Sequence, residues 1–230
     1  MHDKIKIKGA IFDIDGTLLD SMPIWQDACA RYLRSIGVMP EPGLSETVFS
    51  MTLNEGVLYT KNHYQLENTY EEIEKGILGQ IEDFYYNEAK LKPGVYEFVM
   101  ALYNKGIPMV LATTGDENLA SYALDKNKIL KCFDGLLTCN ALNTSKKELL
   151  IFDRCKSIIE EKYGEKLSER DIAVFEDSIT AIKTTRAAGY RIVGIADDAG
   201  KESWNEIEAA SDVFIKSLDE LDAEDICIQR

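Results

Sequence analysis

The sequence predicts an α/β protein: a doubly wound, mostly parallel sheet with an inserted all-helical cap domain. From about residue 94 onward, short apolar runs alternate with segments that have helical spacing of apolar residues. Residues 22–91 interrupt this alternation with helix-like patterning and no convincing strand. Alternating strands and helices indicate a parallel sheet covered by helices on both faces, with ligands at the carboxyl ends of the strands.

The expected strands are short apolar runs bounded by charged or turn-forming residues. They lie at 7–12, 107–112, 135–138, 171–175, 191–195 and 212–215. The expected helices of the same domain lie at 94–105, 116–127, 146–163, 178–188 and 201–210. We therefore assign residues 1–21 and 92–230 to an α/β core domain.

Residues 22–91 are expected to form the helical cap domain. One predicted helix carries Trp25, Cys29, Tyr32, Leu33 and Ile36 on one face, and a longer amphipathic helix carries Tyr70, Ile73, Ile77, Ile81, Phe84 and Tyr85. These side chains are more simply explained as cap core than as a ligand site. Proline and glycine near both ends of the insertion mark two candidate hinges.

Composition limits the partners and the location of the protein. The formal net charge of −14, without a cluster of Lys and Arg, argues against nucleic acid and anionic membranes as partners. Five scattered cysteines and two histidines supply neither a CxxC pair nor a zinc cluster. No signal peptide or membrane-spanning run is evident. We expect a cytoplasmic protein that is a monomer or weak dimer.

Two carboxylates follow the first expected strand. Asp13 and Asp15 are two residues apart, so on extended backbone their side chains point the same way. Like charges this close persist mainly where a cation or a shared proton compensates. The backbone N–H groups at Gly16 suit an anion. A solvated turn is the weaker alternative, and a calcium loop is excluded because its sixth and twelfth positions are Leu18 and Ile24.

A second acidic pair, Glu176 and Asp177, follows the strand at 171–175 and should reach the same edge of the sheet. Mg²⁺ binds through one or two carboxylates, with phosphate and water completing its shell. The predicted magnesium ligands are Asp13, Asp177, Glu176 and the backbone carbonyl of Asp15. Without the other acidic pair, Glu176 and Asp177 before the helix expected at 178–188 would more simply be explained as part of a helix N-cap than as a metal site.

Two further segments suit a phosphate group. Thr113 and Thr114 end the strand that starts at Ile107, where a hydroxyl and successive N–H groups meet a helix N-terminus. Lys146 and Lys147 stand at the expected start of a helix, which the helix dipole disfavours. One of these lysines could neutralise the aspartates and a phosphate; a surface lysine is the alternative.

In this order, the segments resemble the haloacid dehalogenase-like (HAD) superfamily, in particular its capped phosphatases and beta-phosphoglucomutases. The resemblance covers nearly the whole chain and rests on Asp-x-Asp-Gly-Thr-Leu-x-Asp-Ser from Asp13, then Thr113-Thr, the lysine and Phe-Glu-Asp-Ser.

The resemblance implies roles for the site residues. Asp13 would attack phosphorus and form an aspartyl phosphate, and Asp15 would act as acid and base. Thr113 and Lys146 would hold the phosphoryl group, with Gly16 and Thr114 binding substrate. Magnesium would be held by Asp13, Asp177 and Glu176, and the cap would select a small phosphorylated metabolite of the sugar phosphate or phosphoglycolate type.

Some features depart from this pattern. The chain lacks the proline that often follows the lysine in this family. Beta-phosphoglucomutases use an Arg of the cap to bind a second phosphate, and this chain has no Arg between Arg34 and Arg154. Asp15 argues against dehalogenation. The expected function is a magnesium-dependent phosphatase; the alternatives are a beta-phosphoglucomutase-like phosphotransferase and a catalytically silent binding module of the same fold.

Overall fold

The computed structural model describes residues 5–221 and 226–228, and the chain forms two compact units. The larger unit comprises Met1–Asp20 with Lys90–Arg230, and the smaller comprises Ser21–Ala89. The predicted α/β class is confirmed by the larger unit. Within the described residues, no helix is both long enough and apolar enough to cross a bilayer.

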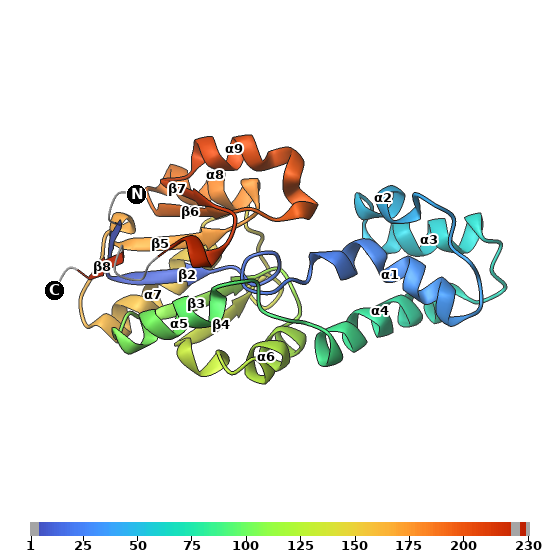
Figure 1. The fold of residues 1–230 in the computed structure, drawn as a ribbon, viewed down its shortest axis with the longest axis horizontal. Helices are drawn as coiled ribbons and strands as arrows, with labels where there is room; N and C mark the ends of the chain where they lie inside the picture. Colours follow the sequence, from blue (N-terminus) through green and yellow to red (C-terminus); the bar gives the residue numbers. More distant parts are fainter. Residues whose placement is uncertain (1–4, 222–225, 229–230) are drawn as a thin grey trace. The chain divides into compact units, whose positions relative to one another are not determined.

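Six parallel strands form the sheet of the larger unit, in the order β4-β3-β2-β5-β6-β7 (Figure 1). They are β2 Gly9–Phe12, β3 Met109–Thr113, β4 Gly135–Thr138, β5 Ile172–Glu176, β6 Arg191–Ile195 and β7 Val213–Ile215. Central strand β2 pairs with β3 on one side and β5 on the other. The chain winds outward from β2 to β4 and then returns to β5. This reversal beside β2 is where doubly wound sheets bind ligands.

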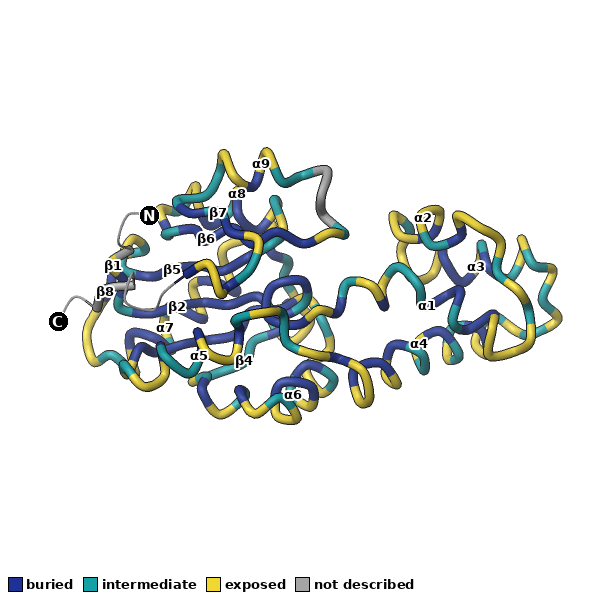
Figure 2. Tube along the Cα trace, viewed as in Figure 1, coloured by how far each residue is buried: buried dark blue, intermediate teal, exposed yellow. Residues whose placement is uncertain are grey.

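Helices cover both faces of this sheet. They are α5 Val95–Asn104, α6 Glu117–Lys126, α7 Leu150–Tyr163, α8 Ile179–Ala188 and α9 Trp204–Ala210, with short 3₁₀ segments η1 Leu130–Cys132, η2 Glu169–Asp171, η3 Asp198–Ser203 and η4 Leu218–Glu220. Side chains of α7, α8 and α9 share one apolar cluster with Ile11 and Val174. On the opposite face Phe12 stacks on Phe175 at 4.2 Å, and Phe98 of α5 meets Phe175 edge-on. β2, β3 and β5 are buried along their whole length (Figure 2), so close packing holds the ends of these three strands in place.

Two expected elements need correction. The strand expected at 7–12 splits at Lys8, where the backbone N–H bonds Asp171 before β5 begins. Residues before the split form β1 Ile5–Ile7, which pairs with β8 Ile226–Ile228 in a separate two-stranded sheet. The helix expected at 146–163 begins only at Leu150. Lys146 instead lies in a preceding turn, in which the N–H of Glu148 bonds the carbonyl of Ser145.

The smaller unit is entirely helical in its regular structure. Its helices are α1 Met22–Ser35, α2 Leu44–Phe49, α3 Leu53–His63 and α4 Tyr70–Asn87. Capping boxes start α3 and α4, each pairing a threonine with a glutamate three residues later. The buried residues of α4 are Ile73, Ile77, Ile81, Phe84 and Tyr85, as the periodicity predicts. Trp25 of α1 and Ile36, the residue that follows this helix, are each 39% exposed, because the buried side of α1 is centred on Ile24, Ala28 and Tyr32.

Candidate active site

Three strand ends place acidic and hydroxyl groups at one edge of the sheet. Asp13 directly follows β2, Thr113 ends β3, and Glu176 ends β5 with Asp177 after it. Because all three strands are parallel and adjacent, their carboxyl ends meet. Ligand oxygens of Asp13, Glu176 and Asp177 lie within 4.8 Å of one another.

The turn after Asp13 is closed by its own backbone. The N–H groups of Leu18 and Leu19 bond the carbonyl of Ile14 at 2.9 and 2.8 Å, and Gly16 N–H bonds the carbonyl of Leu19 at 3.0 Å. Gly16 has φ of +87°, which favours glycine. This tight turn therefore fixes the backbone on both sides of Asp15.

The carboxylate of Asp15 faces the end of β3. A Cβ atom added to Gly115 would lie 2.9 Å from Asp15 Oδ2 and 3.2 Å from Thr113 Oγ1. Only a residue without a side chain fits beside both groups. Asp15 and Thr113 therefore lie close together beside Gly115.

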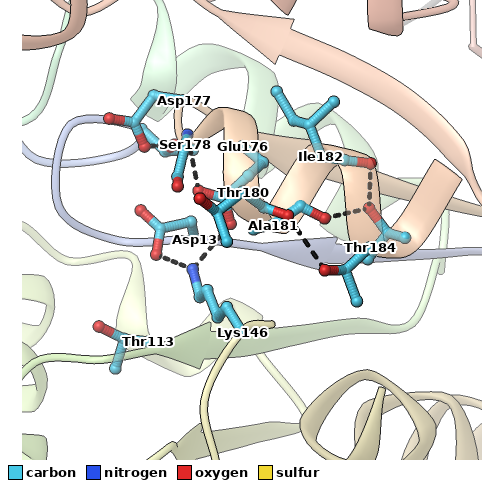
Figure 3. A network of polar contacts seen from close by, with 12 residues as sticks. Asp13, Thr113, Lys146, Glu176, Asp177, Ser178, Thr180, Ala181, Ile182 and Thr184 are labelled. Carbon is cyan, nitrogen blue, oxygen red and sulfur yellow. Dashed lines mark hydrogen bonds and ion pairs between the residues drawn. The ribbon is translucent and has the colours of Figure 1, made fainter. Parts of the chain in front are cut away.

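Lys146 is the lysine of this site. Its ammonium lies between two carboxylates, paired with Asp13 Oδ1 and 2.7 Å from Glu176 Oε2 (Figure 3). The Lys146 side chain is 8% exposed, whereas Lys147 is exposed at the surface. The turn before α7 therefore selects Lys146 from the two lysines that sequence reasoning left open.

The two acids at the end of β5, Glu176 and Asp177, are held differently. Glu176 accepts the N–H of Ser178 on Oε1 at 3.0 Å and Lys146 on Oε2, so both of its oxygens are engaged. Asp177 Oδ1 accepts the hydroxyl of Thr17 at 3.1 Å. Thr17 is fully buried and was not among the predicted site residues, although its place directly after Gly16 is a local signal for such a role.

Burial and mutual repulsion shift the acids of this cluster. Burial, with the Asp13 charge beside it, raises the pKa of Glu176 to about 7 despite the opposing effect of Lys146. Burial and the charges of Asp13 and Glu176 raise the pKa of Asp177 well above its ordinary value. Burial opposes the charge of Lys146, but Asp13 and Glu176 hold its pKa above the ordinary value. The three carboxylates outnumber this ammonium, which is the electrostatic condition that a bound cation relieves.

Thr113 and Thr114 differ in their surroundings. Thr113 is 1% exposed and its hydroxyl accepts the N–H of Gly115 at 2.9 Å, which leaves the hydroxyl proton for another acceptor. Thr114 is exposed, and within the described residues no hydrogen bond joins its side chain to the acids. The carboxylate of Asp116 accepts the N–H groups of Asn118 and Leu119 at 2.8 and 3.1 Å and so caps the first turn of α6.

Sequence reasoning missed a second ion pair at the same edge of the sheet. Lys92 and Asp197 pair at 3.0 Å, with side chains 11% and 8% exposed. Neither residue lies in a motif that could have indicated it.

Comparison with known proteins extends this description. Residues 10–195 match the family described as haloacid dehalogenase-like hydrolase. A phosphorylated carbohydrates phosphatase from Thermotoga maritima is 25% identical over 82% of this chain and 85% of its own length. Hexitol phosphatase B from Escherichia coli K12 is 25% identical over 96% of this chain and 97% of its own.

Solved structures show the same fold. A protein of Thermotoga maritima, provisionally assigned as a beta-phosphoglucomutase, superposes with a TM-score of 0.78 at 22% identity, over 93% of this chain and 96% of its own. The predicted enzyme class, a phosphoric monoester hydrolase of the HAD type, is confirmed at this level by the family match and the relatives named as phosphatases. The chain belongs to the haloacid dehalogenase-like hydrolase family.

Proposed function

We propose that the protein is a magnesium-dependent phosphatase of phosphorylated carbohydrates or polyols, and that it works through an aspartyl phosphate on Asp13. The observation that carries this proposal is the meeting of Asp13, Glu176 and Asp177 with the buried ammonium of Lys146. Carboxylates and an ammonium at one buried point suit the transfer of a phosphoryl group.

In the first half-reaction, one oxygen of Asp13 attacks phosphorus while the bond from phosphorus to the ester oxygen breaks. Asp15 in its protonated form gives its proton to the departing ester oxygen, so the alcohol leaves neutral. In the second half-reaction, the ionised Asp15 takes a proton from the water that attacks phosphorus. The Asp13–phosphoryl bond then breaks and inorganic phosphate leaves.

Thr113 and Lys146 would bind the transferring group. The Thr113 hydroxyl is oriented by the Gly115 N–H that it accepts, so it can donate its proton to a phosphoryl oxygen. The ammonium of Lys146 offsets the charge of Asp13, which lets an anionic phosphate approach an anionic nucleophile. Glu176 holds Lys146 in place.

The residues present fit a magnesium ion. Within the described part of the chain, Asp13 accepts a hydrogen bond from Lys146 on Oδ1, and Asp177 accepts one from Thr17 on Oδ1. The Oδ2 atom of each aspartate can therefore bind a cation. We assign these two carboxylates and the Asp15 carbonyl as ligands of the ion. Both oxygens of Glu176 already accept hydrogen bonds, so we assign Glu176 to holding Lys146 beside the ion. When bound, the ion would polarise the phosphoryl group and offset its charge.

Phosphorylated sugars and polyols are proposed as substrates because the phosphatases named above act on phosphorylated carbohydrates and hexitols. A mutase must also grip a second phosphate. The arginines of the smaller unit are Arg31 and Arg34, and both pair with carboxylates of that unit: Arg31 with Glu88 and Asp27, and Arg34 with Asp27. This internal neutralisation favours a single phosphate and hence the phosphatase.

We further propose that the smaller unit acts as a substrate-selecting cap domain. The predicted monomer or weak dimer and the predicted location of the protein stay predictions.

The test is release of inorganic phosphate from hexitol phosphates, hexose phosphates, glycerol phosphate and phosphoglycolate, with magnesium and with chelator. We expect magnesium-dependent release by the wild type and a loss of at least about a thousandfold in Asp13→Asn. Release that persists in Asp13→Asn would contradict the nucleophile. Conversion of beta-glucose 1-phosphate with a bisphosphate activator, without release, would favour the mutase, and no reaction at all would favour a silent module.

A further inference from the structure

Lys92 is a second largely buried lysine at the carboxyl edge of the sheet, where it bonds to residues that follow two of the strands. Lys92 Nζ donates to the carbonyl of Gly16 at 2.6 Å, to the carbonyl of Ala196 at 2.8 Å and to Asp197 Oδ2 at 3.0 Å. An ammonium has three protons, so these three acceptors use its full donor capacity. The acceptors come from the turn after β2 and from the loop after β6, which Lys92 therefore ties together.

The hydrogen bond to Gly16 places Lys92 next to the turn that carries Asp15, the proposed acid and base. Gly16 follows Asp15 directly, and its left-handed backbone turns its carbonyl to the lysine. Its N–H is already used within the turn by Leu19. The contact with Lys92 thus fixes the peptide plane between Gly16 and Thr17, while the bond from Gly16 N–H to the carbonyl of Leu19 holds the plane between Asp15 and Gly16, so the turn that carries the Asp15 side chain is held at both planes.

Lys92 itself is held by a rigid frame. Its backbone N–H bonds the carbonyl of Leu18 at 2.9 Å, and the preceding residue, Leu91, pairs with Leu19 in an antiparallel bridge. On the other side, the hydroxyl of Ser217 donates to the carbonyl of Pro93 at 2.9 Å. The chain is therefore fixed on both sides of the residue that supplies the ammonium.

Asp197 balances the charge of Lys92 and is itself anchored. Its Oδ1 accepts the N–H of Ala199 at 2.9 Å, and its backbone carbonyl accepts the indole N–H of Trp204 at 2.9 Å. Neutralising a buried lysine does not require a bond to Gly16. The pair therefore has two separable parts: charge balance at Asp197 and positioning at Gly16.

We propose that Lys92 is a positioning residue that holds the turn carrying Asp15 and Gly16 in its reactive geometry through its bond to the Gly16 carbonyl. This proposal rests on the proposed function, since Asp15 must give and take a proton at the substrate. The role of Asp197 is to keep Lys92 charged and directed, without contact to substrate.

Three variants separate positioning from charge balance: Lys92→Met, Asp197→Asn and the double variant. We expect Lys92→Met to lower kcat at least about tenfold with KM changed less than about threefold, because chemistry rather than binding is affected. Asp197→Asn keeps the bond to Gly16 and should stay within about threefold of the wild type in kcat.

The double variant decides between the two roles. It buries neither charge, so its unfolding temperature should return toward that of the wild type, while its kcat should stay as low as that of Lys92→Met. Recovery of kcat along with stability would overturn the proposal, because Lys92 would then only neutralise Asp197. Lys92→Met with wild-type kcat would overturn it as well.

A second readout does not require turnover. Beryllofluoride with magnesium mimics a phosphoryl group on an aspartate, and ¹⁹F NMR measures its binding to the folded protein. We expect Lys92→Met to weaken beryllofluoride binding at least about tenfold and Asp197→Asn to leave it within about threefold. Equal beryllofluoride binding by all variants would overturn the positioning role of Lys92 but would leave Asp13 as the proposed nucleophile. No beryllofluoride binding by the wild type would contradict both.

Discussion

At the scale of single residues, the site concentrates charge that folding alone does not favour. Asp13, Glu176 and Asp177 repel one another in a buried place, and the ammonium of Lys146 offsets only part of their charge. Such clusters persist where a function compensates for their cost. Thr17 and Ser178 orient two of these acids, so the positions of the carboxylate oxygens are fixed before any ligand arrives.

Replacing Asp177 tests the proposed magnesium ligands. Asp177→Asn removes an anionic oxygen from the proposed metal site. We expect the magnesium concentration for half-maximal phosphate release to rise at least about tenfold, because replacing even a residue that only supports a metal ligand typically weakens metal binding by that factor. Asp153→Asn, an exposed aspartate of α7, is the matched control and should leave this concentration unchanged. An unchanged magnesium requirement in Asp177→Asn would remove Asp177 from the ligand set.

At the scale of elements, local signals and long-range contacts contribute differently. The strands ending at Phe12, Thr113 and Glu176 were predictable because apolar runs bounded by acids and turns are local features, and parallel strands share an edge. The acids at those ends were predictable for the same reason. In the smaller unit, apolar periodicity predicted α1 and α4, whereas α2 and α3 were not predicted as separate helices. The capping boxes of α3 and α4 are a further local signal that marks where these two helices start.

Other parts depend on contacts that no local pattern encodes. Lys146 lies in a turn before α7 because its ammonium pairs with Asp13, 133 residues earlier in the chain. Helical periodicity extends across that turn and placed the helix start too early. Lys92 and Asp197 meet only after the sheet has formed. A lone lysine before a proline gives no signal of that partner.

The packing of α1 against α4 can be tested with two glycines of α4. A Cβ at Gly76 would overlap the ring of Tyr32, whereas a Cβ at Gly79 would meet nothing within 4 Å. Gly76→Ala should therefore lower the free energy of unfolding of the smaller unit by about 1–3 kcal/mol. Gly79→Ala, the matched control, should raise this free energy by about 0.5–1 kcal/mol.

Urea unfolding measured by tryptophan fluorescence checks this pair. Trp25 lies in the smaller unit and Trp204 in the larger, and these are the two tryptophans of the chain. On a Trp204→Phe background, Trp25 reports the smaller unit. Equal effects of the two alanines would show that α1 and α4 do not pack at Gly76.

At the scale of the whole molecule, the acidic site adds to a chain whose formal net charge is −14. A phosphate ester must approach an anionic protein, so its attraction depends on local cations. Lys146 and the proposed magnesium ion supply that attraction. The same groups link the stability of the whole larger unit to pH.

The metal-free protein should lose stability as pH rises from about 5 to about 8. The folded protein holds Glu176 at a pKa of about 7, above its ordinary 4.5, and the pKa of Asp177 is also raised. A raised carboxyl pKa means that the folded state binds the proton more tightly, so the stabilisation is complete below the ordinary pKa and disappears as pH passes through the folded one.

Thermal unfolding in chelator at a series of pH values measures this effect. The unfolding temperature should fall across that range in the wild type and fall less in Glu176→Gln, which lacks one of the titrating groups. Magnesium should reduce the fall, because a cation stabilises the ionised acids. A rise of the unfolding temperature with pH in the metal-free wild type would contradict the electrostatics described for this cluster.

In the proposed mechanism, Asp13 carries the phosphoryl group during turnover. An acid-quenched reaction treated with borohydride converts an aspartyl phosphate into homoserine, which peptide mass spectrometry locates. We expect homoserine at position 13 when substrate and magnesium are both present, and unchanged aspartate when either is omitted. Phosphate release with homoserine at position 15, or with no modified residue, would contradict it.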